Sequence, residues 1–376
     1  MEKADGHNEQ WVDKKLIELA DYWNGMAFKP SDWSDDGVKI IRIEQLNNPL
    51  GDYDHYKGSF PEINAIHDGD LIFSWSATLK VAIWKWGDGV LNQHLFKVVP
   101  FEKIDKHFLY FLLDYNMPKL GESSHGSTMK HIKRKELETY SVSIPDSLPA
   151  QRRIAAILSS ADKVIEQTRQ LISKYKSIKQ GMMEDLLKPK EGWKKVKLGE
   201  VGEIITGSTP PTTKLEYWNG EYNFYSPADF DDSAYCCKTE RTITKAGVDI
   251  GRYIPANSIM VACIASIGKI AISKSGGITN QQINTIVPYE EYDYKFLYYL
   301  LLLNTTAIKN KAAQTTIPII NKEDFSNLEF SVPDFPEQKR IASILNGIDS
   351  KIEVEQRVLN KYIQVKKGLM GKLLNE

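Results

Sequence analysis

The residues with the clearest catalytic potential lie in Pro333-Asp-Phe-Pro-Glu-Gln-Lys339. A proline, an aspartate and a Glu-x-Lys triplet belong to a common nuclease site, in which the carboxylates and the lysine converge from neighbouring strands around divalent ions. Here they lie within seven residues at the expected start of a helix, where acidic side chains already interact favourably with the helix dipole. An internal repeat, described below, has Ala150-Gln-Arg152 in place of Glu-x-Lys. We therefore set the nuclease interpretation aside.

Other catalytic motifs are missing from the sequence. An amino-methyltransferase needs an Asn/Asp-Pro-Pro-Tyr/Phe element to hold its flipped base, and neither Asn48-Pro49-Leu50 nor Thr209-Pro-Pro211 supplies it. Ile267-Gly-Lys269 lacks the upstream glycine and the following hydroxyl of a phosphate-binding loop. His125 and His131 have no partners at the spacing of a zinc site. We expect this chain to be no enzyme and to have no catalytic residue, no metal and no cofactor.

The composition is that of an ordinary globular protein, with 42% hydrophobic and 26% charged residues. Cys236, Cys237 and Cys263 cannot form a disulfide framework, and the adjacent pair lacks the spacing of a zinc knuckle. We expect buried thiols in a cytoplasmic protein, because no long apolar run and no signal sequence is present. The net charge of −1 excludes a protein that coats nucleic acid indiscriminately, so any DNA contact requires segregated charge.

The second half of the chain repeats the first, and such a repeat decides the architecture. From Ala150 to Leu187, 16 of 38 positions are identical at an offset of 187, beginning with Gln151-Arg-Arg-Ile-Ala-Ala-Ile-Leu158 against Gln338-Lys-Arg-Ile-Ala-Ser-Ile-Leu345. Upstream the offset is 188, which aligns Asn92-Gln93 with Asn280-Gln281. Near the start it is about 182, with Trp11 against Trp193. The chain is a tandem duplication with insertions.

Two long segments, Gln151 to Lys188 and Gln338 to Glu376, are predicted to be helices. Neither segment contains a proline, and apolar residues recur every three or four positions in both. The stripes include Ile154, Leu158 and Ile165 in the first segment and Ile341, Leu345 and Ile352 in the second. Both stripes skip matched positions, namely Thr168 with Glu355 and Lys179 with Lys366. Polar residues at matched positions of a coiled-coil seam fix its register.

Each helix would span about 57 Å at 1.5 Å per residue, which is longer than a small domain needs. We therefore interpret the helices as spacers that pair in an antiparallel coiled coil. The alternative is that both are long helices of one globular core. The charged face opposite each stripe, with Lys174 and Lys176 in the first helix, argues against that alternative.

The segments from about Trp11 to Pro145 and Trp193 to Pro333 carry short β-rich runs bounded by Gly, Asn, Asp and Pro. The expected strands include Val38 to Ile43, Asp70 to Ser74, Val81 to Trp84 and Ser258 to Ala262. One amphipathic helix is expected in each segment, near Lys106 to Tyr115 and near Tyr294 to Asn304. The predicted fold class is α+β, with two tandem mixed α/β domains that have curved, mainly antiparallel sheets, each followed by a long helix.

These features together resemble the specificity subunit of type I restriction-modification systems. The resemblance rests on the order of β-rich domain, Ile-Pro or Val-Pro, the Gln-Arg/Lys-Arg-Ile-Ala motif and a long helix, given twice, and on Thr206-Gly-Ser-Thr-Pro210, Tyr217-Trp218 and Gln314-Thr-Thr-Ile317. The first domain departs from it, with Asn24-Gly-Met-Ala-Phe-Lys-Pro30 where Thr-Gly-Ser-Thr-Pro would stand. The departure leaves the loops of that domain less securely assigned.

The resemblance implies that each domain recognises one block of a split target in double-stranded DNA while the helices hold the blocks apart. It also implies two methyltransferase subunits as partners, with two restriction (helicase-nuclease) subunits in the full complex, and no membrane. The expected boundaries are 1–148 for the first target recognition domain, 149–190 for its spacer helix, 191–335 for the second domain and 336–376 for the second spacer helix. A coiled-coil scaffold that organises partners without recognising a DNA sequence is the alternative.

Base recognition needs donors and acceptors on loops, with Lys and Arg on phosphates. The candidates in the first domain are Lys80, Asn92, Gln93, His94, Ser127, Thr128, Lys130 and Lys133. Those in the second are Thr213, Lys214, Tyr217, Ser266, Lys269, Asn280, Gln281, Gln282, Gln314, Thr315 and Thr316. Because Asn-Gln occurs in both copies, it is either part of the scaffold or a DNA contact.

Overall fold

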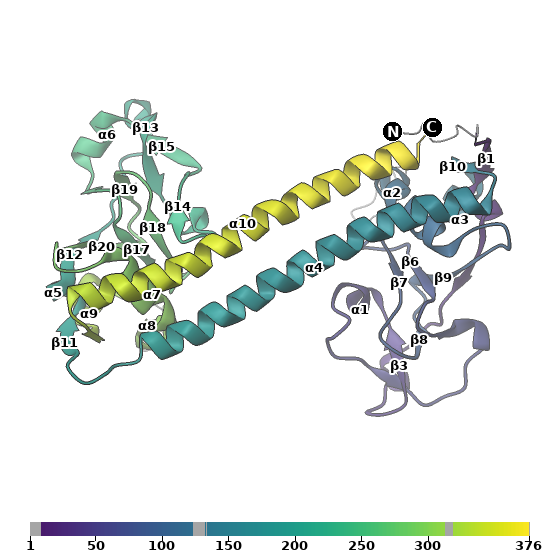
Figure 1. Cartoon of the computed structure of the whole chain (residues 1–376), viewed down its shortest axis with the longest axis horizontal. Coiled ribbons are helices and arrows are strands. Elements are labelled where there is room, and N and C mark those ends of the chain that lie inside the picture. Colours follow the sequence, from purple (N-terminus) through teal and green to yellow (C-terminus); the bar gives the residue numbers. More distant parts are fainter. Residues whose placement is uncertain (1–8, 123–131, 133, 313–318, 376) are drawn as a thin grey trace, which may run out of the picture. The chain divides into compact units, whose positions relative to one another are not determined.

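The computed structural model describes residues 9–122, 132, 134–312 and 319–375. The chain divides into two compact units, drawn from residues 1–167 with 360–376 (unit 1) and from residues 168–359 (unit 2). The boundary between them falls inside both long helices, α4 (Leu148–Leu186) and α10 (Phe335–Leu373) (Figure 1). Each unit therefore contains one β-rich domain and a part of each long helix.

Unit 1 contains a two-stranded ribbon, β1-β10, and two four-stranded sheets, with the orders β2-β9-β6-β7 and β4-β3-β8-β5. Among the described pairs of named strands in this unit, only β3 and β8 run parallel. The elements are β1 (Trp11–Lys15), η1 (Leu16–Glu18), β2 (Ala20–Asn24), η2 (Pro30–Asp32), β3 (Val38–Ile41), α1 (Ile43–Asn47), β4 (His55–Tyr56), η3 (Glu62–Asn64), β5 (Ala65–Ile66), β6 (Leu71–Ser74), β7 (Lys80–Ile83), β8 (Gly89–Leu91), β9 (Leu95–Pro100), α2 (Lys106–Glu122), α3 (Arg134–Thr139) and β10 (Ser141–Pro145).

Unit 2 contains the ribbon β11-β21, a five-stranded sheet β12-β20-β17-β18-β14 and a four-stranded sheet β15-β13-β19-β16. The elements are β11 (Lys194–Lys197), α5 (Leu198–Val201), β12 (Gly202–Thr206), η4 (Leu215–Tyr217), β13 (Trp218–Tyr225), η5 (Pro227–Asp229), β14 (Tyr235–Cys236), β15 (Arg241–Ile243), α6 (Lys245–Ile250), β16 (Tyr253–Ile254), β17 (Ile259–Ala262), β18 (Ile270–Ser273), β19 (Gly277–Thr279), β20 (Ile283–Pro288), α7 (Tyr294–Leu303), α8 (Thr305–Ala312), α9 (Lys322–Ser326) and β21 (Glu329–Val332).

The two units have one topology. The order β2-β9-β6-β7 in unit 1 corresponds strand by strand to β12-β20-β17-β18 in unit 2, which adds β14 at its edge. The order β4-β3-β8-β5 corresponds to β15-β13-β19-β16, and the central pair is parallel in both sheets. The predicted pair of mixed α/β domains with mainly antiparallel sheets is confirmed.

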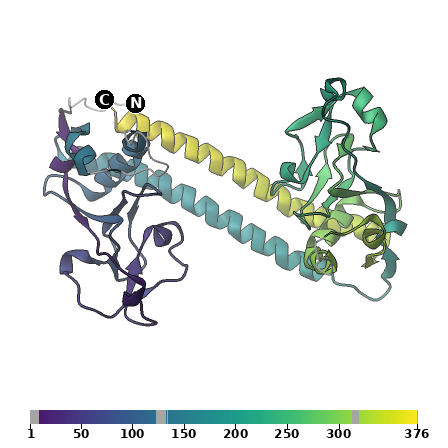
Figure 2. The ribbon, with the colours of Figure 1, turned by 180° about the vertical axis from the view of Figure 1, so that it is seen from behind.

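Both long helices take part in both units. In unit 1 the first turns of α4 lie beside the last turns of α10, and in unit 2 the last turns of α4 lie beside the first turns of α10 (Figures 1 and 2). The helices therefore run antiparallel. Leu158 of α4 and Leu345 of α10 are fully buried, as the predicted apolar stripe requires.

Each domain core is completed by the helix of the other repeat. The core of unit 1 includes Met370 from α10 and Leu374 just beyond its end, and the core of unit 2 includes Met183 of α4 and Leu187 just beyond it. The predicted apolar stripes end with Met182 and Leu186 in the first helix and with Leu369 and Leu373 in the second. These four residues are partly buried and pack against the same cores. The last turns of each helix therefore bury adjacent positions, because they pack against a domain core.

The lysines at the matched polar positions of the two stripes form partly buried ion pairs. In unit 2, Lys179 Nζ lies 2.7 Å from Asp349 Oδ1, and both side chains are 16% exposed. The matched pair in unit 1 joins Lys366 to Asp162 at 2.6 Å, with side chains 15% and 36% exposed. Asp162 and Asp349 are themselves repeat mates at the offset of 187. The same polar lock therefore occurs once in each unit.

A buried glutamine attaches each helix to its domain. Gln151 Oε1 accepts a hydrogen bond from the Asp105 N–H at 2.8 Å, and its Nε2 donates to the Pro145 carbonyl at 3.0 Å. Gln338 Oε1 accepts from the Asp293 N–H at 2.9 Å, and its Nε2 donates to the Pro333 carbonyl at 3.0 Å. This clamp explains why both copies of the helix motif begin with glutamine.

The expected strand from Val38 to Ile43 is too long by two residues. The structure ends β3 at Ile41 and begins α1 at Ile43. The Arg42 N–H donates to the Gln45 side-chain oxygen at 3.1 Å. This local bond occupies a backbone donor and starts the helix instead of extending the strand.

Candidate nucleic-acid interface

The shared asparagine shapes the same turn in both units. Asn92 Oδ1 accepts from the His94 N–H at 3.3 Å, and the Asn92 N–H donates to the Ile41 carbonyl at 2.9 Å. Asn280 Oδ1 accepts from the Gln282 N–H at 3.1 Å, and its N–H donates to the Tyr225 carbonyl at 2.9 Å. Asparagine favours such turns because its side chain bonds the backbone two residues on. This geometry gives both asparagines a scaffold role.

A glycine loop lies directly against each turn. A Cβ on Gly207 would lie 1.9 Å from the Asn280 carbonyl oxygen, and one on Gly25 would lie 2.3 Å from that of Asn92. Only glycine permits this approach. The segments Asn24 to Pro30 and Thr206 to Pro210 therefore begin at equivalent places, although their sequences differ.

The residues after each asparagine differ between the units. Gln93 Nε2 lies 3.3 Å from His94 Nε2, and the His94 ring packs on Trp75 with ring centres 5.7 Å apart. In unit 2, Gln281 is exposed and its side-chain oxygen accepts a hydrogen bond from the Thr209 hydroxyl. The same asparagine turn in the two units is thus followed by different polar side chains.

In unit 2 these groups border an open concavity of about 410 Å³. It is formed by the loop after β12, the end of β13 with η5, the start of β15, and the turn between β19 and β20. The lining residues are Thr209, Phe224, Ser226, Asp229, Glu240, Arg241, Asn280, Gln281 and Gln282. Arg241 is not among the residues predicted from the sequence. Asn280 to Gln282 were predicted through the repeat, whereas no repeat partner marks Arg241.

The other candidates are scattered or already engaged. Lys80 Nζ donates to the Leu46 carbonyl at the end of α1, and Lys269 Nζ donates to the Pro227 carbonyl at 3.3 Å. Thr213 and Lys214 are exposed, with the Lys214 ammonium 5.4 Å from the centre of the Tyr217 ring. Ser266 is half-buried in the turn before Lys269. Ser127, Thr128, Lys130, Lys133, Gln314, Thr315 and Thr316 lie outside the described residues.

The nuclease-like motif forms a helix start. Asp334 Oδ1 accepts from the Glu337 N–H at 3.1 Å. Glu337 bonds both Nε and Nη2 of Arg340 at 2.6 and 2.7 Å, and these bonds hold the pKa of Glu337 below its ordinary value. Both carboxylates therefore stabilise the start of α10.

The expectation of buried thiols is confirmed for Cys236 and Cys263 but is wrong for Cys237, which is exposed. Cys237 directly follows the edge strand β14, where successive side chains face opposite sides. Burial raises the pKa of the Cys236 thiol to about 12 and that of the Cys263 thiol to about 11, so neither is a reactive thiolate. No cluster of three His, Cys, Asp or Glu side chains suited to a metal occurs in the described ranges. None of the described helices has the length and apolar character needed to cross a membrane.

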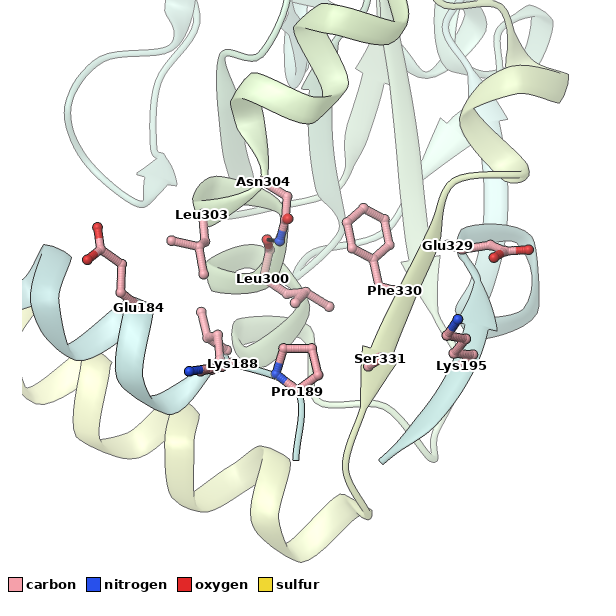
Figure 3. Close-up of a pocket in the computed structure, with 11 residues that line it drawn as sticks. Glu184, Lys188, Pro189, Lys195, Leu300, Leu303, Asn304, Glu329, Phe330 and Ser331 are labelled. Carbon is pink, nitrogen blue, oxygen red and sulfur yellow. Dashed lines mark hydrogen bonds between the residues drawn. The ribbon is translucent and has the colours of Figure 1, made fainter. Parts of the chain in front are cut away.

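A second hollow, of about 420 Å³, lies within unit 2 where α4 ends (Figure 3). Its lining combines apolar side chains such as Leu303 and Phe330 with Glu184, Lys188, Lys195 and Glu329. In unit 1 the mate of Leu303 is Tyr115, whose hydroxyl accepts a hydrogen bond from Asn375. The side chain at this position is therefore smaller in the second copy than in the first.

Comparisons with known proteins agree with this architecture. A family model described as the type I restriction modification DNA specificity domain matches residues 8–176 and again residues 190–363. The chain is 31% identical over 179 residues to the type I restriction enzyme MjaIX specificity subunit of Methanocaldococcus jannaschii, a match that covers 46% of this chain and 41% of that relative. It is 24% identical to the type I restriction enzyme EcoBI specificity subunit of Escherichia coli, covering 95% of this chain and 83% of that one.

The chain thus spans about two fifths of the length of the first of these relatives. Among solved structures, the S subunit of a type I restriction-modification system from M. genitalium is similar, with a TM-score of 0.64 at 15% identity over 99% of this chain and 98% of that one. This likeness extends the fold assignment to the whole chain.

Proposed function

The chain belongs to the type I restriction-modification DNA specificity family, and we propose that it is a non-catalytic subunit that recognises a split, asymmetric DNA target. The observation that carries this proposal is the repeated frame with diverged loops: the Asn turn and its glycine contact are the same in both units, while the neighbouring polar side chains differ. Two unlike copies suit two unlike blocks of sequence. Dimeric DNA-binding proteins use two like copies for symmetric sites.

The proposed contacts with bases and phosphates are those exposed and half-buried members of the predicted set that directly follow an Asn turn or lie between β12 and β13. In unit 1 they are Gln93 and His94, and in unit 2 they are Gln281, Gln282, Thr213, Lys214 and Tyr217. Phosphate contacts set the position of a protein on DNA, and contacts with base edges set its specificity. Lys214 fits the first role and the glutamine side chains fit the second, because an amide can bond adenine through two atoms.

The experiment is a selection from random duplexes with the chain assembled with its methyltransferase subunit. Enrichment of two short blocks separated by unselected positions supports the proposal. Binding without any enrichment would sink it and leave the scaffold alternative, in which the coiled coil organises partners alone. Metal-dependent cleavage or methyl transfer by the isolated chain would contradict the non-catalytic role.

We propose that the methyltransferase subunits dock on the long helices. In unit 1, Ile157 and Val164 of α4 are seven residues apart and are 45% and 37% exposed. In unit 2, Leu171 and Ile178 of α4 have the same spacing, and Ile178 is 38% exposed. An exposed apolar row at heptad spacing favours a partner helix. Two methyltransferase and two restriction subunits per chain would match the two repeats, in the cytoplasm and away from membranes.

Lysine substitutions test the docking proposal. Ile157→Lys and Ile178→Lys are expected to weaken co-purification of the methyltransferase subunit at least tenfold, because each places a charge in an apolar contact. Ser173→Lys, at an exposed polar position of the same helix, is the matched control and should bind as the unchanged chain does. Equal binding by all three variants would show that the partner sits elsewhere.

A further inference from the structure

Arg241 is held in place by an aromatic platform. Its guanidinium carbon lies 3.7 Å from the centre of the Trp218 ring and 5.6 Å from that of Phe224. Trp218 is itself fixed, since it is 6% exposed and its Nε1–H donates to the Pro211 carbonyl at 3.2 Å. Arginine stacks on aromatic faces in this way, and the stack sets the plane of its donors.

The guanidinium of Arg241 is not used inside the fold. Among the described residues, no ion pair or side-chain hydrogen bond involves it, although the residue is exposed at the start of β15. The contrast is Arg42 of unit 1, which lies 4.8 Å from the Trp33 ring but also forms an ion pair with Asp54. Arg252 is likewise engaged, donating to the Thr206 carbonyl at 2.9 Å. Arg241 combines a fixed orientation with uncommitted donors.

The surroundings favour a base edge over a phosphate. Arg241 borders the concavity of unit 2 together with Gln281, Gln282, Glu240 and Asp229. Two carboxylates beside a single arginine repel a phosphate group. A G·C pair instead offers the O6 and N7 acceptors of guanine to an arginine and the N4 donor of cytosine to a carboxylate.

We propose that Arg241 recognises a guanine in the major groove through two hydrogen bonds and is a specificity-determining residue of the second recognition domain. The inference rests on the proposed DNA-recognition function and assigns it one base pair. Glu240, exposed next to Arg241, is the acceptor available to the paired cytosine.

The test is the duplex selection with the assembled complex, repeated with Arg241→Gln and Arg241→Lys. A bidentate contact contributes a discrimination of roughly 5- to 150-fold. We expect Arg241→Gln to lose that preference at one G·C position of one block, with all other selected positions unchanged. Arg241→Lys keeps the charge but not the planar pair of donors, so it should also relax the same position. Lys245→Gln, which removes an exposed charge from the same unit, should select the unchanged motif.

Three results would overturn the inference. The first is an unchanged motif in Arg241→Gln. The second is an equal weakening on every duplex with a salt dependence reduced by about one charge, which identifies a phosphate contact. The third is a selected motif of Arg241→Lys that is identical to the motif of the unsubstituted chain. If the unsubstituted complex enriches no motif at all, the proposed function fails together with this inference, so the two failures are told apart by the unsubstituted chain.

Discussion

Replacement of Asp349 by asparagine is expected to destabilise unit 2 far more than the matched change at Asp162 destabilises unit 1. Asp349 accepts from the Tyr299 hydroxyl at 2.7 Å in addition to its ion pair with Lys179. The mate of Tyr299 in unit 1 is Phe111, which has no hydroxyl. The two ion pairs therefore occupy equivalent positions, but the tyrosine hydroxyl that bonds to Asp349 has no counterpart at Phe111.

The magnitude follows from burial and from the remaining charges. Removing one partner of a buried pair strands the other and costs about 3–5 kcal/mol when both are fully buried. Because Lys179 and Asp349 keep 16% of their exposure, we expect about 2–4 kcal/mol for Asp349→Asn. Asp162 is 36% exposed, and Asp114 interacts electrostatically with Lys366 as a second carboxylate. Asp162→Asn should therefore cost about 1 kcal/mol or less.

The assay is urea unfolding of the full chain with hydrogen exchange resolved by peptide, because a chain of two units need not unfold in one step. The variant that combines Lys179→Met and Asp349→Leu with Tyr299→Phe should recover most of the stability, since well-packed apolar residues replace a buried pair at little cost and no tyrosine hydroxyl is left without its acceptor. Equal costs for Asp349→Asn and Asp162→Asn, or strictly additive effects of Lys179→Met and Asp349→Leu, would refute the reasoning.

Three further outcomes are expected. Gln338→Leu should cost about 2–4 kcal/mol in urea unfolding because it leaves a buried N–H and a carbonyl unpaired, whereas Gln364→Leu, at an exposed position, should stay within about 0.5 kcal/mol. Seven residues inserted after both Ser177 and Gln364 lengthen each helix by about 10.5 Å. This insertion should add about three base pairs, at ~3.4 Å per pair, to the unselected spacer of the DNA target and leave both recognised blocks unchanged. Altered blocks would contradict the spacer role of the helices. Burial raises the pKa of Asp114 above its ordinary value. The contribution of this carboxyl group to stability is therefore present below its pKa in the unfolded chain and is lost as the pH rises through its pKa in the folded chain. Asp114→Asn should raise the melting temperature at pH 7 but not near pH 4, and a difference in melting temperature that does not change with pH would count against this.

The sequence predicted the secondary structure most accurately where the heptad periodicity and the internal repeat agreed. The heptads placed α4 and α10 to within three residues of their observed starts and ends, because an apolar stripe is a local pattern. The repeat in turn predicted two domains of one fold. The deeper burial of Met183 than of Met182 at the end of α4 could not be foreseen, since it depends on which surface the last turns meet.

The candidate interface was predicted only in part, for the same reason. The turn at Asn280 stood out because its mate at Asn92 lies at a constant offset. Arg241 depends on Trp218, which β13 brings beside β15 through antiparallel pairing. No local pattern connects the two residues, and the segment has no close counterpart in the first copy. Divergence, which is what a specificity site requires, removes the signal that repeats provide.

The completion of each core by the other repeat sets a condition on exchanging recognition domains. Replacing Trp11 to Pro145 with the domain of a relative should change one block of the target and leave the other. It also leaves Met370 and Leu374, now 8% and 3% exposed, against a foreign core. Full burial of such side chains contributes about 1.5–3 kcal/mol each, so a poor fit should lower the melting temperature by several degrees. Exchanging residues 369–375 together with the domain should restore it, because the donor's own helix end then fills the core. Equal stability of the two chimeras would mean that the helix end adapts to any core.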